Sequence, residues 1–292
     1  MKVIRAAEMG MCFGVRDALK IAENVSDPSQ VTIHGELVHN PVVNQRLQEA
    51  GFHQSTEDSR CVSVQTPLVL ITAHGISNAE RDRLRVAGKP VIDTTCPLVR
   101  RVHDAAMELK SEGRHVLLIG KRGHVEVQGI VEDLDSHDVV SCPSEVRCYP
   151  SRNLGIVCQT TMPPDVVTEI CSHIQLHNPL ANIRLIDTVC HPTRRRQSAL
   201  QELLSRVDAV VVVGGRNSNN TRRLVQLCHD QLKPALHVES AEELDPAWFT
   251  DVETVGLTAG TSTLDETIDA VEKRLEVMRG RTPLSRIARY NK

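Results

Sequence analysis

The chain has 292 residues, enough for about two or three domains of ordinary size. Its 34 Lys and Arg against 37 Asp and Glu give a net charge of −3, which argues against broad neutralisation of a nucleic-acid backbone. Apolar residues make up 40% of the chain, yet no run of them is long enough to span a membrane, and the N-terminus does not have the pattern of a signal peptide. We therefore expect a cytoplasmic protein that binds neither nucleic acid nor membrane.

Three segments of the chain resemble one another, and each is built around a cysteine. A short apolar, strand-like stretch precedes Cys12, Cys96 and Cys190, which are spaced 84 and 94 residues apart. A helical pattern begins at each cysteine, so we predict helices in 12–24, 96–113 and 190–208. The recurrence of strand, cysteine and helix in the same order indicates an internal repeat.

The repeat continues downstream of each predicted helix. A strand pattern follows in 31–40, 115–127 and 209–221, and a later strand ends in a small polar turn in 68–77, 154–162 and 254–262. Strands that alternate with helices at this spacing predict parallel α/β units. We therefore predict three related α/β lobes with mainly parallel sheets, bounded at 1–94, 95–188 and 189–292, the last with a short C-terminal tail.

Nine cysteines without a signal peptide indicate thiols or metal ligands rather than a disulfide framework. Ligands bind beyond the carboxyl ends of parallel strands, and three lobes around a pseudo-threefold axis would direct Cys12, Cys96 and Cys190 to one point. Three thiolates at helix starts suit a [4Fe–4S] cluster with one iron left open, whereas a structural zinc usually takes four ligands. The alternative is that a threefold ancestor left three buried structural thiols.

Neutral hydrogen-bond donors follow the strands of all three predicted lobes. They include His39, His74 and His124, the run 217–220 and the pair 261–262. Singly, each is a common surface histidine or turn residue, but gathered around one axis they would form a cradle for an anion such as phosphate. Glu126 lies two residues after His124. It is either a solvated loop charge or a proton donor whose pKa burial has raised.

Together these motifs resemble the LytB family of 4-hydroxy-3-methylbut-2-enyl diphosphate reductases. The resemblance covers nearly the whole chain, through MCFGV, ELVHNPVV, TAHGIS, DTTCPLV, GHVEVQG, QTTM, VVGGRNSNNT and TAGTS in that order. It implies a trefoil of three α/β lobes around a central iron–sulfur cluster. It also implies that Cys12, Cys96 and Cys190 are the three ligands of a [4Fe–4S] cluster with one open iron.

The resemblance implies roles for further residues. Glu126 becomes the proton donor, and Thr160 helps to hold Glu126 and the substrate hydroxyl in position. The substrate-binding residues that it implies are His39, His74, His124, Thr160, Ser218, Asn219, Asn220 and Ser262.

The implied reaction is the reductive dehydroxylation of (E)-4-hydroxy-3-methylbut-2-enyl diphosphate to isopentenyl diphosphate and dimethylallyl diphosphate, the last step of the non-mevalonate isoprenoid route. Two electrons come from an external donor, expected to be ferredoxin or flavodoxin. One alternative is a [4Fe–4S] dehydratase similar to quinolinate synthase, which needs no electron donor. The other is a non-enzymatic iron–sulfur sensor, against which the phosphate cradle and Glu126 both argue.

The chain departs from the family pattern at a few positions. Val125 and Leu264 replace common prolines, and we expect Val125 to loosen its loop. Asn219 stands where serine is frequent, which leaves its side-chain contact open. The basic runs 100–101 and 194–196 are either solvated helix faces or a docking surface for an acidic electron carrier. Six cysteines receive no role: Cys61, Cys142, Cys148, Cys158, Cys171 and Cys228.

Overall fold

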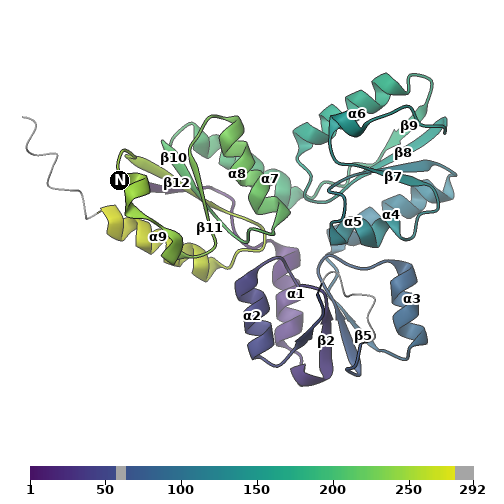
Figure 1. Ribbon diagram of the computed structural model, residues 1–292, viewed down its shortest axis with the longest axis horizontal. Helices are drawn as coiled ribbons and strands as arrows, with labels where there is room; N and C mark the ends of the chain where they lie inside the picture. The colour runs from purple at the N-terminus through teal and green to yellow at the C-terminus, as the bar shows by residue number, and fades with distance from the viewer. Residues whose placement is uncertain (57–63, 280–292) are drawn as a thin grey trace, which may run out of the picture. The chain divides into compact units, whose positions relative to one another are not determined.

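The computed structural model describes residues 1–56 and 64–279, and their strands form three four-stranded sheets (Figure 1). The strands are β1 (Lys2–Arg5), β2 (Val31–His34), β3 (His53–Gln54), β4 (Leu68–Ile71), β5 (Val91–Asp93), β6 (His115–Ile119), β7 (His137–Val140), β8 (Asn153–Cys158), β9 (Asn182–Leu185), β10 (Ala209–Val213), β11 (Ala235–Val238) and β12 (Thr254–Ala259). The helices are α1 (Phe13–Glu23), α2 (Pro41–Glu49), α3 (Asn78–Val86), α4 (Pro97–Ser111), α5 (Val125–Val131), α6 (Pro164–His177), α7 (His191–Leu204), α8 (Asn219–Asp230) and α9 (Asp265–Arg279).

The three sheets share one strand order. It is β1-β12-β10-β11 in the first, β5-β4-β2-β3 in the second and β9-β8-β6-β7 in the third, with every pair parallel. In each sheet the edge strand that opens this order leads directly to one of the three repeated cysteines. The prediction of three parallel α/β lobes is confirmed, and the repetition extends to the order of the strands.

The N-terminal strand pairs far from its place in the sequence. Lys2–Arg5 lies parallel to β12, so it belongs to the sheet of the C-terminal third, whereas the predicted first lobe, 1–94, includes it. The connectivity explains this difference, because each strand that precedes a cysteine joins the sheet of the repeat before it. By compactness, residues 1–11 group with the described part of 195–292, and residues 12–194 form a second unit. The three lobe boundaries stay a prediction.

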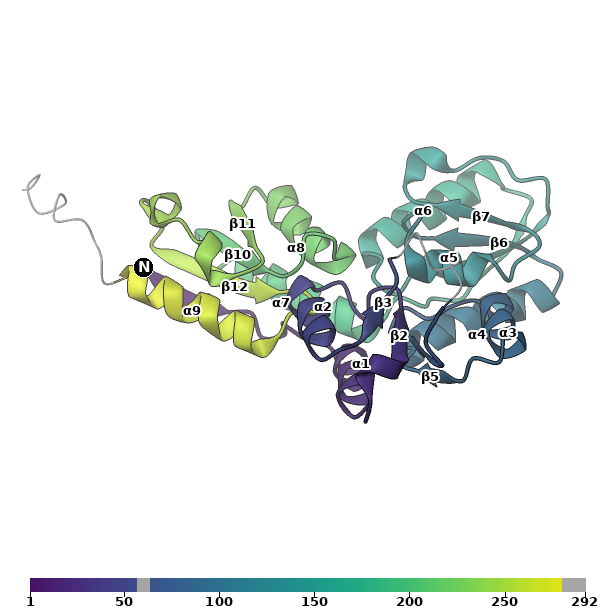
Figure 2. The same ribbon diagram turned by 60° about the horizontal axis from the view of Figure 1, so that its bottom comes forward.

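Aliphatic side chains cover both faces of the sheets. In β6, Leu117 and Ile119 enter one core while Val116 and Leu118 enter the opposite one, and all four are fully buried. A strand buried on both faces has a continuous apolar sequence, as in HVLLI and AVVVV. In the sheet that contains β10 and β12, α9 packs on one face and α7 and α8 on the other (Figure 2). No helix in the described ranges is both long and apolar enough to cross a membrane.

Two glycines let the helices that follow the cysteines pack closely on their sheets. A Cβ on Gly155 of β8 would lie 2.9 Å from the side chain of Leu109 on α4, and a Cβ on Gly256 of β12 would lie 2.9 Å from that of Leu203 on α7. Each leucine is the thirteenth residue after its cysteine. The close contact between glycine and leucine is therefore part of the repeat.

This packing makes a testable prediction. Gly155→Ala should destabilise the chain by about 1–3 kcal/mol through overpacking, and Leu109→Ala by about 2–5 kcal/mol through cavity formation. Because the smaller side chain at position 109 makes room for the new methyl group, the double variant should lose at least about 0.5 kcal/mol less than the sum of the two. Urea denaturation of the four proteins measures these values. Additive losses would show that this contact does not set the spacing between helix and sheet.

Candidate active site

The three repeated cysteines occupy equivalent positions, each immediately before a helix. Cys12 and Cys96 are the N-cap residues of α1 and α4, and Cys190 directly precedes α7, as predicted. In each case the N–H of the fourth residue after the cysteine donates to the cysteine carbonyl, at 3.0, 3.0 and 3.2 Å, and closes the first turn. Each thiol therefore lies at the positive end of a helix dipole, which favours its thiolate form.

The thiols are half-buried and lie within electrostatic reach of one another. A Cβ on Gly14, in the first turn of α1, would collide with the sulfur of Cys96. Burial raises the pKa of Cys96 and raises that of Cys190 to about 11, and the charges of Cys12 and Glu126 add to both effects. Such buried thiols become thiolates when a metal cation offsets the cost of burial.

The arrangement fits a cluster better than a single ion. Within residues 1–56 and 64–279, no three His, Cys, Asp or Glu side chains lie close enough together to hold one metal ion. In an iron–sulfur cluster each thiolate binds a different iron, so its ligands lie further apart than those of a single ion. Three thiols at helix starts are compatible with a cluster, whereas a structural zinc would usually need a fourth ligand.

Thr160 connects Glu126 to the loop that carries Cys190. Its N–H donates to Oε1 of Glu126 over 2.7 Å, and its hydroxyl donates to Oε2 over 2.9 Å. Its carbonyl accepts the N–H of Cys190 over 2.9 Å. Both oxygens of the Glu126 carboxylate are thus fixed in a site where this residue is only 2% exposed.

The environment of Glu126 prepares it for proton transfer. Burial raises its pKa to about 7, although the two hydrogen bonds from Thr160 and the charge of His39 act in the opposite direction. Desolvation therefore outweighs the hydrogen bonds. A carboxyl group with a pKa near neutrality is protonated often enough to act as a general acid and is still acidic enough to release its proton.

His39, His74 and His124 lie ring against ring. The centroids of His39 and His74 are stacked 4.3 Å apart, and His124 meets the two rings edge-on at 5.4 and 5.8 Å. Nδ1 of His124 accepts the N–H of Glu126 over 3.1 Å, so the proton of the neutral ring is on Nε2. Nδ1 of His39 lies 3.0 Å from the carboxylate of Glu36. Three imidazoles gathered in this way can bind an anion.

Two acidic residues after α5 hold the turn that follows His74. Glu132 accepts the hydroxyl of Ser77 over 2.6 Å, and Asp133 accepts two backbone N–H groups at the start of α3, over 2.7 and 3.1 Å. Helix α5 begins directly after His124 and ends directly before Glu132. It therefore links the His74 turn to the His124 loop and helps to set their relative position.

Sequence reasoning did not identify Glu36, Glu132 or Asp133. One local signal was present, because Ser77 and Glu80 have the spacing of a capping box that starts a helix. Nothing in the sequence pairs that helix start with acidic residues more than 50 positions away.

The remaining predicted site residues lie in the unit made of 1–11 and the described part of 195–292. Ser218 is the N-cap of α8, which begins at Asn219, and Oδ1 of Asn220 accepts the N–H of Thr261, directly before Ser262, over 3.0 Å. Nδ2 of Asn220 is buried and has no hydrogen-bond partner among the residues that the structure describes. It is thus a donor available to an anion. That these residues share one site with the three histidines stays a prediction.

The departures from the family pattern fall at helix starts. Val125 is the first residue of α5, where proline is also favoured, and the N–H of this position needs no partner within the helix. The valine therefore costs the helix no hydrogen bond. Leu264 is buried directly before α9. Cys61 and the tail after residue 280 lie outside the described residues.

Three further cysteines, Cys158, Cys171 and Cys228, have the environments of structural thiols. Cys158 and Cys228 are fully buried in two hydrophobic cores, and burial raises the pKa of Cys228 to about 12. Burial likewise raises the pKa of Cys171, to about 11. Thiols of this kind pack as small apolar groups, so they suit control substitutions.

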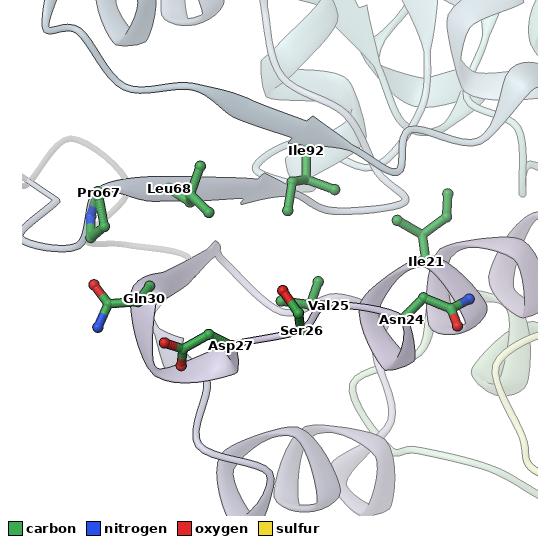
Figure 3. A pocket seen from close by; sticks show the side chains of 9 residues that line it. All are labelled: Ile21, Asn24, Val25, Ser26, Asp27, Gln30, Pro67, Leu68 and Ile92. Atoms are coloured by element: carbon green, nitrogen blue, oxygen red, sulfur yellow. The ribbon is translucent and has the colours of Figure 1, made fainter.

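A cavity of about 570 Å³ lies at the end of the β3-β2-β4-β5 sheet that is opposite to the cysteine and histidine loops (Figure 3). It is lined by Leu68 at the start of β4, by Gln30 just before β2 and by Asn24 just after α1. These are the amino ends of the strands, whereas the cysteines and histidines follow the carboxyl ends. The cavity is therefore separate from the candidate site.

Comparison with known proteins places the chain in a family. The model of the LytB protein family matches residues 3–276. The chain belongs to the LytB family. Members named 4-hydroxy-3-methylbut-2-enyl diphosphate reductase include that of Aquifex aeolicus, 36% identical over 282 residues that cover 94% of this chain and 96% of that protein. The one from Geobacter sulfurreducens is 33% identical and covers 94% of this chain and 97% of its own.

Solved structures support the same assignment. The E-1-hydroxy-2-methyl-but-2-enyl-4-diphosphate reductase from Plasmodium falciparum matches this LytB chain with a TM-score of 0.84 and 26% identity, over 94% of this chain and 87% of its own. A second (E)-4-hydroxy-3-methyl-but-2-enyl diphosphate reductase, described as the terminal enzyme of the non-mevalonate pathway, matches with a TM-score of 0.68 and 35% identity, over 95% of this chain and all of its own. The family resemblance predicted from the motifs is confirmed.

The raised pKa of Glu126 can be tested without catalysis. Because the folded state holds this proton more tightly than the unfolded chain does, the carboxyl stabilises the fold fully below about pH 4 and loses that contribution as the pH rises through about 7. Glu126→Gln removes the titration. The free energy of unfolding of the variant, relative to wild type, should therefore rise by about 2–3 kcal/mol between pH 5 and pH 8.

Urea denaturation of the metal-free proteins at several pH values measures this difference. Glu23→Gln, at an exposed position on α1, is the matched control and should show little change with pH. A difference that stays constant with pH for Glu126→Gln would show that burial does not raise the pKa of Glu126.

Proposed function

We propose that this chain is a 4-hydroxy-3-methylbut-2-enyl diphosphate reductase, which removes the allylic hydroxyl of its substrate to give isopentenyl diphosphate and dimethylallyl diphosphate. One observation carries the proposal: Thr160 holds the buried carboxyl of Glu126 beside the loop of Cys190. The naming of family members at 33–36% identity over more than nine-tenths of the chain supports it.

The cofactor that the site accommodates is a [4Fe–4S] cluster held by Cys12, Cys96 and Cys190, with one iron free of protein ligands. When bound, it supplies electrons one at a time and a Lewis acid for the substrate hydroxyl. The chain contributes three thiols at helix starts, where the dipoles stabilise the thiolate forms.

The diphosphate of the substrate binds to the imidazole N–H groups of His39, His74 and His124. Ser218, Asn219, Asn220 and Ser262 supply further donors, of which Nδ2 of Asn220 is the buried one without a partner in the described ranges. Binding energy at this unreactive end of the substrate is used to orient the hydroxyl and to keep water out.

Glu126 gives its proton to the departing oxygen while Thr160 keeps the carboxyl in place. The balanced reaction consumes one allylic alcohol, two electrons and two protons and gives the isoprenoid diphosphate and water. The electrons come from an external one-electron donor, either ferredoxin or flavodoxin. The identity of this donor and the cytoplasmic location stay predictions.

Anaerobic purification, followed by electron-spin resonance spectra with and without the diphosphate substrate, tests the proposal most directly. A substrate-dependent change in the spectrum of the cluster, together with turnover that needs a reductant, is the expected result. Turnover that proceeds without a reductant would favour a dehydratase similar to quinolinate synthase. A cluster that does not respond to the substrate would favour an iron–sulfur sensor.

Removal of any one cysteine ligand should remove the cluster. We expect Cys12→Ser, Cys96→Ser and Cys190→Ser to lose most of their iron and their brown colour, because the open iron leaves no fourth protein ligand to compensate. Cys228→Ser is the control, since that thiol is buried in a core away from the helix starts. Iron analysis and optical spectra measure the result. Normal iron content in all four variants would rule out this ligand set.

Substitution of Glu126 should separate chemistry from binding. Glu126→Gln can still accept the N–H of Thr160 at its amide oxygen and can donate from its amide nitrogen to the Thr160 hydroxyl, but it has no acidic proton. Turnover should therefore fall by roughly two orders of magnitude or more, with little loss of substrate affinity. His124→Ala should mainly weaken binding. In the wild type, turnover should also decline as the pH rises above about 7, because the acid form of Glu126 is lost.

Anaerobic steady-state kinetics with a dye donor, paired with spectral titrations of the substrate, measure both effects. Near-normal turnover in Glu126→Gln would leave the diphosphate or a bound water as the proton source.

A further inference from the structure

The residues that directly follow the three cysteines are all exposed. They are Phe13, Pro97 and His191, each the first residue of its helix. The rings of Phe13 and His191 are stacked with centroids 5.6 Å apart and planes only 9° from parallel. Phe13 is 39% exposed and is the one exposed Phe, Tyr or Trp ring in the described ranges. An exposed residue therefore follows each proposed cluster ligand, and two of the three, Phe13 and His191, form a stacked aromatic patch.

Arginines border this patch in a repeated pattern. The fourth residue after each cysteine is an arginine, and Arg101 adds another on α4. The side chains of Arg100 and Arg194 are 53% and 38% exposed. We call this patch, with its arginines, the helix-start surface. Its members are Phe13, Pro97, His191, Arg16, Arg100, Arg101 and Arg194.

The helix-start surface is continuous and carries a positive charge. Phe13 contacts His191, and Arg101 donates to the carbonyl of Asp187 over 3.5 Å, which joins α4 to the loop of Cys190. Arg194 pairs with Asp187, and Arg100 shares Asp93 with Arg81. Two further acidic residues, Asp17 and Asp104, are exposed on α1 and α4. With Arg81 included, these five arginines and four carboxylates sum to a charge of +1, in a chain whose net charge is −3.

We propose that the helix-start surface is the docking site for the electron donor, a small acidic one-electron carrier protein. This inference rests on the proposed function, because the docked carrier would supply the electrons that the proposed reaction consumes. A carrier that packs against Phe13 and His191 lies one residue from two cluster ligands, Cys12 and Cys190. Electron-transfer complexes are small and weak and depend on complementary charge around an apolar centre, as this surface provides.

The electron balance is simple. Each docking event oxidises one reduced carrier by one electron, and two such events with two protons convert one allylic alcohol into the product and water. A small dye donor needs no docking surface, so it can reduce the enzyme by diffusion. The surface should therefore matter for a protein donor and not for a dye.

The test compares donors in the cluster-loaded protein. In the double variant Arg16→Glu with Arg101→Glu, the KM for reduced ferredoxin or reduced flavodoxin should rise by about tenfold or more. The increase of this KM with salt concentration should become weaker. The rate with dithionite-reduced methyl viologen should stay within about twofold of wild type. Calorimetric titration with the oxidised carriers gives the dissociation constant as a readout that does not depend on turnover.

Arg85→Glu is the matched control, because Arg85 is 81% exposed near the end of α3, at the amino ends of the strands. It should leave the KM for both carriers unchanged. If charge reversal also lowers the rate with the dye, the measurement is repeated with two variants that add no negative charge. These are the double variant Arg16→Gln with Arg101→Gln and, separately, Phe13→Ala. A change with one carrier alone identifies that carrier as the partner.

Unchanged KM and dissociation constants for both carriers in these variants would overturn the proposed docking site. That outcome differs from failure of the proposed function, in which the wild-type protein would not turn over the substrate with methyl viologen either.

Discussion

The candidate site depends on three hydrogen bonds made by Thr160. Its N–H and hydroxyl hold the carboxylate of Glu126, and its carbonyl holds the N–H of Cys190. A buried carboxyl group can avoid its desolvation cost by rotating toward solvent unless such bonds retain it. Because Thr160 follows the end of β8, the sheet fixes all three bonds at once. This one turn thus keeps the Glu126 carboxyl buried near the thiols, where desolvation raises its pKa although the two hydrogen bonds lower it.

A similar turn recurs beside Cys96, whose N–H donates to the carbonyl of Ala73, directly before His74, over 3.0 Å. Asp93 and Asp187, each three residues before a cysteine, accept backbone N–H groups in the same way, over 2.9 and 3.1 Å. Two sets of hydrogen bonds therefore position the loops of Cys96 and Cys190. One set comes from the neighbouring strand end and the other from the loop's own aspartate. Cys12 follows Met9, Gly10 and Met11 and has no such aspartate.

Much of this arrangement could be predicted from local sequence. Helix starts at Cys12, Cys96 and Cys190 follow from apolar periodicity, and the parallel sheets follow from buried runs such as AVVVV. The pairing of β1 with β12 could not be predicted in this way, because a four-residue apolar strand fits the edge of any sheet. The hydrogen bonds that Glu132 and Asp133 accept at the start of α3 could not be predicted either. They join two segments that no local sequence pattern relates.

The threefold repeat places side chains at equivalent positions, and the residue types at those positions differ between the repeats. The turn that follows the last strand of each repeat carries His74, Thr160 or Ser262, three donors of similar reach but different chemistry. In the proposed site, a carboxyl group beside all three turns would place several negative charges near one anionic substrate, and their repulsion would raise each pKa well beyond a useful range. A single acid, Glu126, avoids that repulsion, with the neutral side chains of His124 and Thr160 beside it. In the proposed docking surface, exposed arginines such as Arg100 would attract an acidic partner without competing with the three histidines for the substrate anion.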